Sequence, residues 1–197
     1  FPNGWERLVV RNTLGIEYDK YPSEKGIIVN NVSTIYAIYE MFKYNRPLTE
    51  RVITITGPGI KKKKNVKVKI GALASEIISN LDGYKNIKNP LFIVGGPMMG
   101  KSMPCDDVVI TKDVTSIIVM EDHFEKNLPC IKCGKCTMVC PANIMPVLIM
   151  ENIDNIDNLK KLKCNKCIGC SLCSYICPSK IEVREFVNIA KEKVNHK

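Results

Sequence analysis

Two cysteine runs near the C-terminal end of the chain share one spacing, and they constrain its fold more than any other feature. Each run places three cysteines with two residues between neighbours, then three residues, then a cysteine followed by proline. The cysteines concerned are Cys130, Cys133, Cys136, Cys140, Cys167, Cys170, Cys173 and Cys177. Because the second run repeats the first at a constant offset, the sequence predicts an internal duplication whose halves form a pseudo-twofold pair.

This spacing is typical of 4Fe-4S clusters in bacterial ferredoxins. Three thiolates on a tight loop reach three corners of one cubane, and the fourth, followed by proline, reaches the other cluster. We therefore expect one cluster to be bound by Cys130, Cys133, Cys136 and Cys177. The second cluster is expected on Cys167, Cys170, Cys173 and Cys140. Two clusters tied together through crossed ligands suit the relay of single electrons.

Zinc and disulfides are the alternatives for so many cysteines. Zinc sites use paired knuckles separated by a longer spacer, and a disulfide scaffold would spread its cysteines over several loops. Neither fits two crowded runs that both end in Cys-Pro. Cys164 extends the second run backwards, so ligand sets starting there are conceivable, but the offset between the runs favours Cys164 as a bystander. We expect Cys105 to be a small buried hydrophobe, and neither His123 nor His196 to be a ligand.

The net charge of +9 invites a nucleic-acid interpretation, which the sequence does not favour. The lysines are scattered, and the aromatic residues (7%) do not interleave with basic clusters as a base-stacking surface requires. No apolar run reaches the length of about 18–20 residues that spans a bilayer. Lys132, Lys135 and Lys166 lie in or beside the cysteine loops, where they could raise the cluster potential and attract an acidic partner. The alternative is that they are ordinary solvated lysines.

The first 122 residues have the pattern of mixed helix and strand. We expect a short buried strand at 26–29, and a helix after it with an apolar stripe of Ile35, Ile38, Tyr39 and Phe42. Alternating segments at 51–56 and 65–70 predict a hairpin, followed by a helix at 73–81 and a strand at 91–94. Two further strands are expected at 108–110 and 116–120. Hairpin, helix and strand together are typical of a small β-grasp module.

The residues resemble the C-terminal part of RnfC, a component of the Rnf electron-transport complex. The resemblance is carried by 46–57 (RPLTERVITITG), by 95–100 (GGPMMG) and by the two cysteine runs. That family is similar to the flavin-binding subunit of respiratory complex I, with an FMN and NADH domain, a β-grasp domain called SLBB, and a two-cluster domain. The resemblance implies an FMN contribution from Asn30, Asn31 and Thr34, at a helix start that favours phosphate. The alternative is that Asn31 or Ser33 only caps the helix.

We therefore expect an α+β chain of three parts. Residues 1–48 would be the end of a flavin/NADH-type α/β domain, 49–122 the SLBB β-grasp domain with connecting strands, and 123–197 the α-helical bacterial-ferredoxin-like domain. The family's glycine-rich flavin loop is absent, and Phe1-Pro2-Asn3-Gly4 is not typical of a native start, so we expect a piece of a longer protein. FMN should therefore bind weakly or not at all here.

The expected function is that of an electron-transfer subunit between a flavin/NAD(H) site and a partner redox protein. No residue is a candidate catalytic acid, base or nucleophile, so the chain is expected to be part of an oxidoreductase rather than a complete enzyme. Its partners would be other redox subunits of a membrane complex, or a ferredoxin or flavoprotein, on the cytoplasmic face of the membrane. The alternatives are a soluble relative that feeds a cytoplasmic reductase, and a ligand-sensing β-grasp protein with redox-switch clusters.

Overall fold

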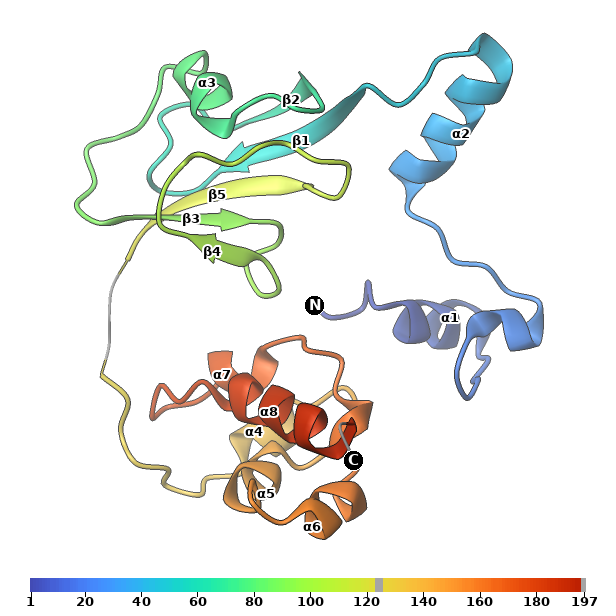
Figure 1. Cartoon of the computed structure of the whole chain (residues 1–197), viewed down its shortest axis with the longest axis vertical. Coiled ribbons are helices and arrows are strands. Elements are labelled where there is room, and N and C mark those ends of the chain that lie inside the picture. Colours follow the sequence, from blue (N-terminus) through green and yellow to red (C-terminus); the bar gives the residue numbers. More distant parts are fainter. Residues whose placement is uncertain (123–125, 196–197) are drawn as a thin grey trace.

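The computed structural model describes residues 1–122 and 126–195. Figure 1 shows three groups of elements: two N-terminal helices, a sheet with one helix, and a cluster of short helices that ends the chain. His123 and His196, which were not expected to be ligands, lie outside the described residues. Among the residues that are described, no helix is both long enough and apolar enough to cross a membrane.

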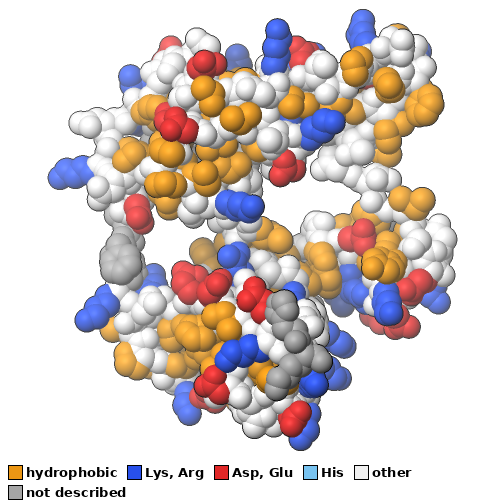
Figure 2. Space-filling view, viewed as in Figure 1, with side chains coloured by type: hydrophobic (Ala, Val, Ile, Leu, Met, Phe, Trp, Pro, Cys, Tyr) orange, Lys and Arg blue, Asp and Glu red, His pale blue; other side chains and the backbone are white. Residues whose placement is uncertain are grey.

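The basic side chains follow no single element. On the face that Figure 2 shows, Lys and Arg side chains are spread over all three groups of elements, and acidic side chains lie between them. A surface that tracks a nucleic-acid backbone would gather its positive charge along one groove or stripe. This face therefore agrees with the scattered lysines of the sequence.

The N-terminal segment contains α1 (Glu6–Leu14), a 3-10 turn η1 (Pro22–Lys25) and α2 (Val32–Tyr44). The helix predicted after residue 30 is confirmed, and it ends at Asn45 in the left-handed conformation. Its apolar stripe is exposed: none of the described α2 residues is buried, and Phe42 is 87% exposed. The strand predicted at 26–29 is wrong. Ile28 is 80% exposed, and in the described chain no strand lies alongside this segment to pair with it.

The middle of the chain forms a five-stranded mixed sheet. Its strands are β1 (Glu50–Thr56), β2 (Lys64–Lys69), β3 (Pro90–Val94), β4 (Lys101–Met103) and β5 (Ser116–Glu121). The order across the sheet is β2-β1-β5-β3-β4, with β1 and β5 parallel and the other pairs antiparallel. The predicted hairpin and the strands at 91–94 and 116–120 are thus confirmed.

One hydrophobic core joins this sheet to α3 (Ala74–Ser79), the helix predicted at 73–81. Alternate residues of β1 point inward, so Ile53 and Ile55 are fully buried, and Ile78 of α3 packs against the same core. The segment predicted as a strand at 108–110 makes only an isolated bridge, between Leu73 and Val109. Its backbone is satisfied instead by the loop that precedes α3, with hydrogen bonds of 2.8–2.9 Å.

The C-terminal part is helical. It contains α4 (Lys135–Met138), α5 (Pro146–Glu151), α6 (Ile156–Lys161), η2 (Cys164–Lys166), α7 (Leu172–Tyr175) and α8 (Val183–Asn195). The longest, α8, buries Val187 and Ala190 against α5 and α6, where Ile149 and Leu159 are fully buried. This packing fixes the chain that follows each of the two cysteine runs.

Candidate metal centres

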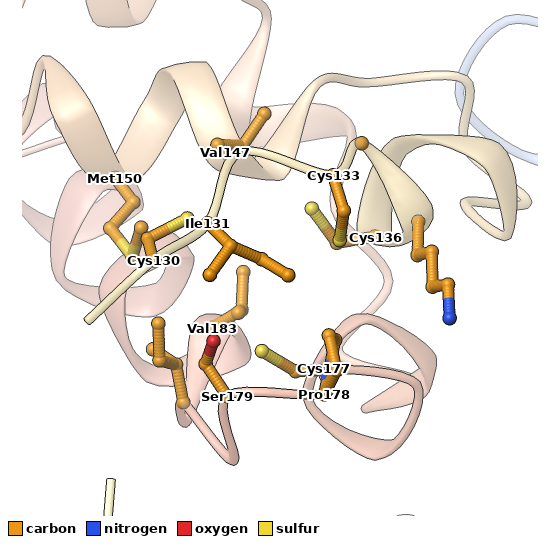
Figure 3. A pocket seen from close by; sticks show the side chains of 13 residues that line it. Cys130, Ile131, Cys133, Cys136, Val147, Met150, Cys177, Pro178, Ser179 and Val183 are labelled. Carbon is orange, nitrogen blue, oxygen red and sulfur yellow. The ribbon is translucent and has the colours of Figure 1, made fainter. Parts of the chain in front are cut away.

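The first of two cavities in the helical part brings together cysteines that are far apart in the sequence. Cys177, from the end of the second run, faces the loop of the first run across an opening (Figure 3). The space measures about 370 Å³ with the solvent at its mouth, and apolar side chains such as Val147, Met150 and Val183 wall it. Its cysteines are Cys130, Cys133, Cys136 and Cys177.

The second cavity has the reciprocal composition. It measures about 340 Å³ on the same basis and is walled by Ile144, Leu172 and Val187. Its cysteines are Cys140, Cys167, Cys170 and Cys173. The structure therefore groups the eight cysteines in the two crossed sets expected from their spacing. Their individual roles as cluster ligands stay a prediction.

The two loops share an unusual backbone that makes these cavities possible. Lys132 in the first loop and Gly169 in the second occupy equivalent positions, and both have positive φ, of 53° and 69°. Each also donates its backbone N–H to the sulfur of the first cysteine of its run, at 3.4 Å. Hydrogen bonds to sulfur favour the thiolate and raise the potential of an iron–sulfur centre.

Ser179 positions the ends of the two cysteine runs, which the motif spacing did not reveal. Its side chain is only 3% exposed, and its hydroxyl donates to the carbonyl of Pro129 at 3.0 Å. Its own carbonyl accepts from the N–H of Leu128 at 2.9 Å. Together these bonds tie the chain just before Cys130 to the chain just after Cys177. The signal was present in the sequence, because the first copy has alanine at the matching position, Ala142.

Burial changes the acidity of several of these thiols. It raises the pKa of Cys173 from its ordinary value of 9.0 to about 11, and it also raises the pKa of Cys136 and Cys170. Iron–sulfur ligands bind as thiolates, so these thiols must lose their protons when a cluster is inserted. The folded apo chain therefore holds the inner cysteines in their neutral form at neutral pH.

This shift predicts how the apo chain responds to alkali. Because the folded-state pKa of Cys173 is raised, the stability from its buried neutral thiol is complete below about pH 9 and is lost as pH rises toward 11. Urea unfolding of apo protein at pH 8 and pH 10.5 should show this loss. Cys173→Ala should reduce the loss, whereas Cys105→Ala, at an exposed thiol, should leave it unchanged. An equal loss of stability between pH 8 and pH 10.5 in the unmodified protein and in both variants would contradict the assignment of this loss to Cys173.

The two remaining cysteines lie elsewhere. Of the described cysteines, Cys105 and Cys164 line neither cavity. Cys164 is 1% exposed and packs in the core around Ile149 and Val187, in accordance with a bystander role that stays a prediction. The expectation that Cys105 is buried is wrong: its side chain is exposed, because it lies in a bend after the edge strand β4.

Cys164→Ala tests whether Cys164 is a bystander or a cluster ligand. We expect the variant to keep about eight irons per chain and to lose about 1 kcal/mol of stability, because it removes only packing. Cys173→Ala, at another buried cysteine, should lose about four irons. Iron and acid-labile sulfide analysis of both purified proteins makes the comparison. Loss of about four irons from Cys164→Ala would make Cys164 a ligand.

The residues predicted to contribute to FMN binding lie at the exposed start of α2. Asn31 is the N-cap of this helix, and its side-chain oxygen accepts from the backbone N–H of Ser33 at 2.8 Å. Asn30 and Thr34 are also exposed. A groove between α2 and β1 is lined in part by Ser33 and Arg51, and the three predicted residues are not among its described lining residues. Capping accounts for Asn31, and the flavin role stays a prediction.

Comparison with known proteins first identifies the class of domain to which the two cysteine runs belong. Residues 129–181 match the 4Fe-4S dicluster domain family, so the helical part is an electron-transfer domain with two 4Fe-4S clusters. The chain is also 32% identical over 151 residues to the C subunit of the ion-translocating oxidoreductase complex of Rhodobacter capsulatus. The same component of the Pectobacterium atrosepticum complex is 31% identical over 153 residues, and that of Vibrio cholerae is 32% identical over 153 residues.

The chain is therefore an RnfC-like homologue of these proteins. Each alignment covers 74% of the chain but only 29%, 22% and 20% of the Rhodobacter, Pectobacterium and Vibrio proteins. The chain thus spans less than a third of the length of these relatives.

Proposed function

We propose that this chain relays single electrons between a flavin/NAD(H) site and a partner redox protein, as a subunit of a membrane electron-transport complex. The observation that carries the proposal is the crossing of the two cysteine sets. Each cavity takes three cysteines from one run and the fourth from the other. Bound 4Fe-4S clusters supply reversible one-electron chemistry at both places. Shared ligand runs hold the two places at a fixed separation.

The side chains around the cysteines are suited to this task. Val147, Met150 and Ile181 give the first cavity an apolar inner wall, which lowers the polarity around the sulfurs on that side. The N–H groups of Lys132 and Gly169 stabilise negative charge on the sulfurs beside them. In the second loop, the guanidinium of Arg184 donates to the hydroxyl of Ser171 at 2.8 Å, which braces that loop against α8. The scaffold therefore resists movement when the charge of a centre changes by one electron.

The division into 1–48, 49–122 and 123–197 belongs to the same proposal. The strand order β2-β1-β5-β3-β4, with a parallel central pair and a helix after the first hairpin, supports a β-grasp (SLBB) module in the middle part. In the longer protein, we assign FMN and NAD(H) to an α/β domain that includes 1–48, with Asn30, Asn31 and Thr34 near the flavin. The proposed location is the cytoplasmic face of the membrane, bound through other subunits.

Anaerobic purification followed by metal analysis and EPR tests the relay. About eight irons and eight sulfides per chain, with two interacting S = 1/2 centres after dithionite reduction, are expected. Potentiometric titration should give low, reversible one-electron couples. Tightly bound zinc without a reducible signal, or centres that degrade on a single oxidation cycle, would overturn the proposal.

A further inference from the structure

The second cysteine run has a thiol beside it that the first run does not have. Cys164 lies three residues before Cys167, and the matching position of the first copy, three residues before Cys130, is Asn127. Cys164 is 1% exposed and lines neither cavity, whereas Asn127 is exposed. The duplication therefore supplies an internal comparison, because only one copy places a buried thiol just ahead of its first cysteine.

The turn η2 brings Cys164 and Cys167 to the same side of the chain. The backbone N–H of Cys167 donates to the carbonyl of Cys164 at 3.0 Å, which closes a turn of the 3-10 type. Side chains three residues apart on such a turn are eclipsed, and a rise of about 2 Å per residue separates their Cα atoms by about 6 Å. A disulfide requires a Cα separation of about 4.4–6.8 Å. The backbone is therefore in range for a bond between the two sulfurs.

Packing holds both side chains against the same hydrophobic core. Cys164 belongs to the buried core around Ile149 and Val187, and Cys167 packs against that core. The ammonium group of Lys191 in α8 donates to the carbonyl of Cys167 at 3.0 Å, so the end of the turn is tied to the helix that supplies this core. A bond between the two sulfurs therefore requires rotation of side chains and little movement of the backbone.

The two thiols differ in their access to solvent. Cys167 is half-buried and lines the second cavity, whereas Cys164 is buried behind it in the core. In thiol–disulfide exchange, the accessible thiol forms a mixed disulfide first, and a neighbouring thiol then displaces the added group. Redox-sensing cysteines often have such a resolving cysteine beside them. The pair has this arrangement, with Cys167 as the accessible thiol and Cys164 as the resolving one.

We propose that Cys164 and Cys167 form a reversible disulfide when the second cavity holds no iron–sulfur cluster, with oxidised glutathione or a similar small disulfide as the oxidant. The sulfur of Cys167 attacks one sulfur of the oxidant, and the first glutathione leaves with the proton of Cys167. The sulfur of Cys164 then attacks the sulfur of Cys167, and the second glutathione leaves with the proton of Cys164. The chain loses two electrons and two protons, and the small disulfide gains both.

This bond controls whether the second cavity can be loaded. It occupies Cys167, one of the four cysteines of that cavity, and a 4Fe-4S cluster takes four thiolates. The four cysteines of the first cavity lie outside the pair and stay free. Disulfides in reducing compartments are usually transient and redox-sensing, and a dithiol reductant returns both sulfurs to thiols. This consequence rests on the proposed cluster function, whereas the disulfide itself does not.

Peptide mapping of the apo chain tests the pairing directly. Trypsin cleaves after Lys163 and Lys166, so a reduced chain releases 164–166 apart from 167–180, and a disulfide holds the two peptides together. The apo chain is equilibrated with an excess of oxidised glutathione, and its free thiols are then alkylated. We expect most of the 164–166 peptide to be linked to 167–180, through Cys167 in the fragment spectra.

Two variants are the controls for this mapping. In Cys164→Ala, which removes the resolving thiol, we expect Cys167 to keep one bound glutathione. Asn127→Cys in the same background moves the extra thiol to the first copy, where the chain forms no helix or turn. Its pairing with Cys130 should be at least about fivefold lower than that of Cys164 with Cys167, because no turn aligns the two side chains.

Three results would overturn the proposal. The first is a Cys164 that stays open to alkylation after treatment with oxidised glutathione. The second is linkage of Cys164 to Cys170 or Cys173 as often as to Cys167. The third is equal pairing in the Asn127→Cys variant, which would mean that spacing alone, and not the turn η2, forms the bond.

Mapping of the loaded chain keeps this failure distinct from failure of the relay. A chain with about eight irons, kept anaerobic in the same glutathione buffer, should show no linked peptide until a chelator removes the iron. Linkage in the fully loaded chain would contradict the competition between disulfide and cluster. A chain that loads about eight irons but forms no link as apo protein contradicts only the disulfide. A chain that forms the link but holds no reducible clusters contradicts the relay.

Discussion

Two triple variants that share two substitutions and differ in the third are expected to retain different amounts of iron. Cys130→Ala with Cys133→Ala and Cys177→Ala removes three of the four cysteines of the first cavity and leaves the second intact. It should retain about four irons per chain. Replacing Cys177→Ala by Cys140→Ala in the same background damages both cavities, because Cys140 lines the second one. That variant should retain almost no iron.

The comparison tests the crossing alone, because both proteins lose three cysteines and both keep one of the two Cys-Pro pairs. If each run bound its own cluster without crossing, the outcomes would be reversed, and the Cys140 variant would keep about four irons. Loss of one cluster could also unfold the helical part in both proteins. Single serine variants then decide the matter, since a serine oxygen can replace the sulfur: Cys130→Ser and Cys177→Ser should shift the same EPR signal, and Cys140→Ser the other.

The crossing could be predicted because it follows from local spacing. Three cysteines separated by two residues can lie on one tight loop, and the proline after the fourth ends that loop, so the fourth must face a different partner. The strands at 51–56 and 65–70 could also be predicted from the sequence, because alternation of apolar and polar residues indicates a strand in a sheet with one buried face. In both cases the determining residues are neighbours in the sequence.

The features that were missed depend on neighbours far away in the chain. The apolar run 26–29 has the composition of a strand, but a strand requires a partner, and the described chain places none beside it. β4 has only three residues and follows a glycine-rich turn, so no periodicity could reveal it. The unequal exposure of the two cysteine loops also depends on tertiary contacts, since Cys130 is exposed whereas Cys167 packs against the core around Ile149. Motif spacing describes the two loops as equivalent, and the fold makes them different.

Gly57 should be the most sensitive single position of the sheet. It follows β1 with φ of 116°, and a Cβ there would lie 2.1 Å from the carbonyl oxygen of Val119 in β5. A backbone atom at that distance cannot move aside without breaking the pairing of the central strands β1 and β5. Gly57→Ala should therefore destabilise the sheet by about 4 kcal/mol or more, which is a large effect for one methyl group.

Gly71→Ala is the matched control, because it adds the same methyl group at another positive φ, of 96°, where no described atom lies within 4 Å of the new Cβ. It carries the backbone strain alone, so we expect a loss of about 1–3 kcal/mol. Urea unfolding followed by far-UV circular dichroism gives both values, and their difference measures the clash with β5. Both variants should still contain about eight irons, since the two cysteine cavities are built within 130–187. Equal losses from Gly57→Ala and Gly71→Ala would mean that β5 yields to the methyl group, and that the close approach of the turn to Val119 does not hold the central strands together.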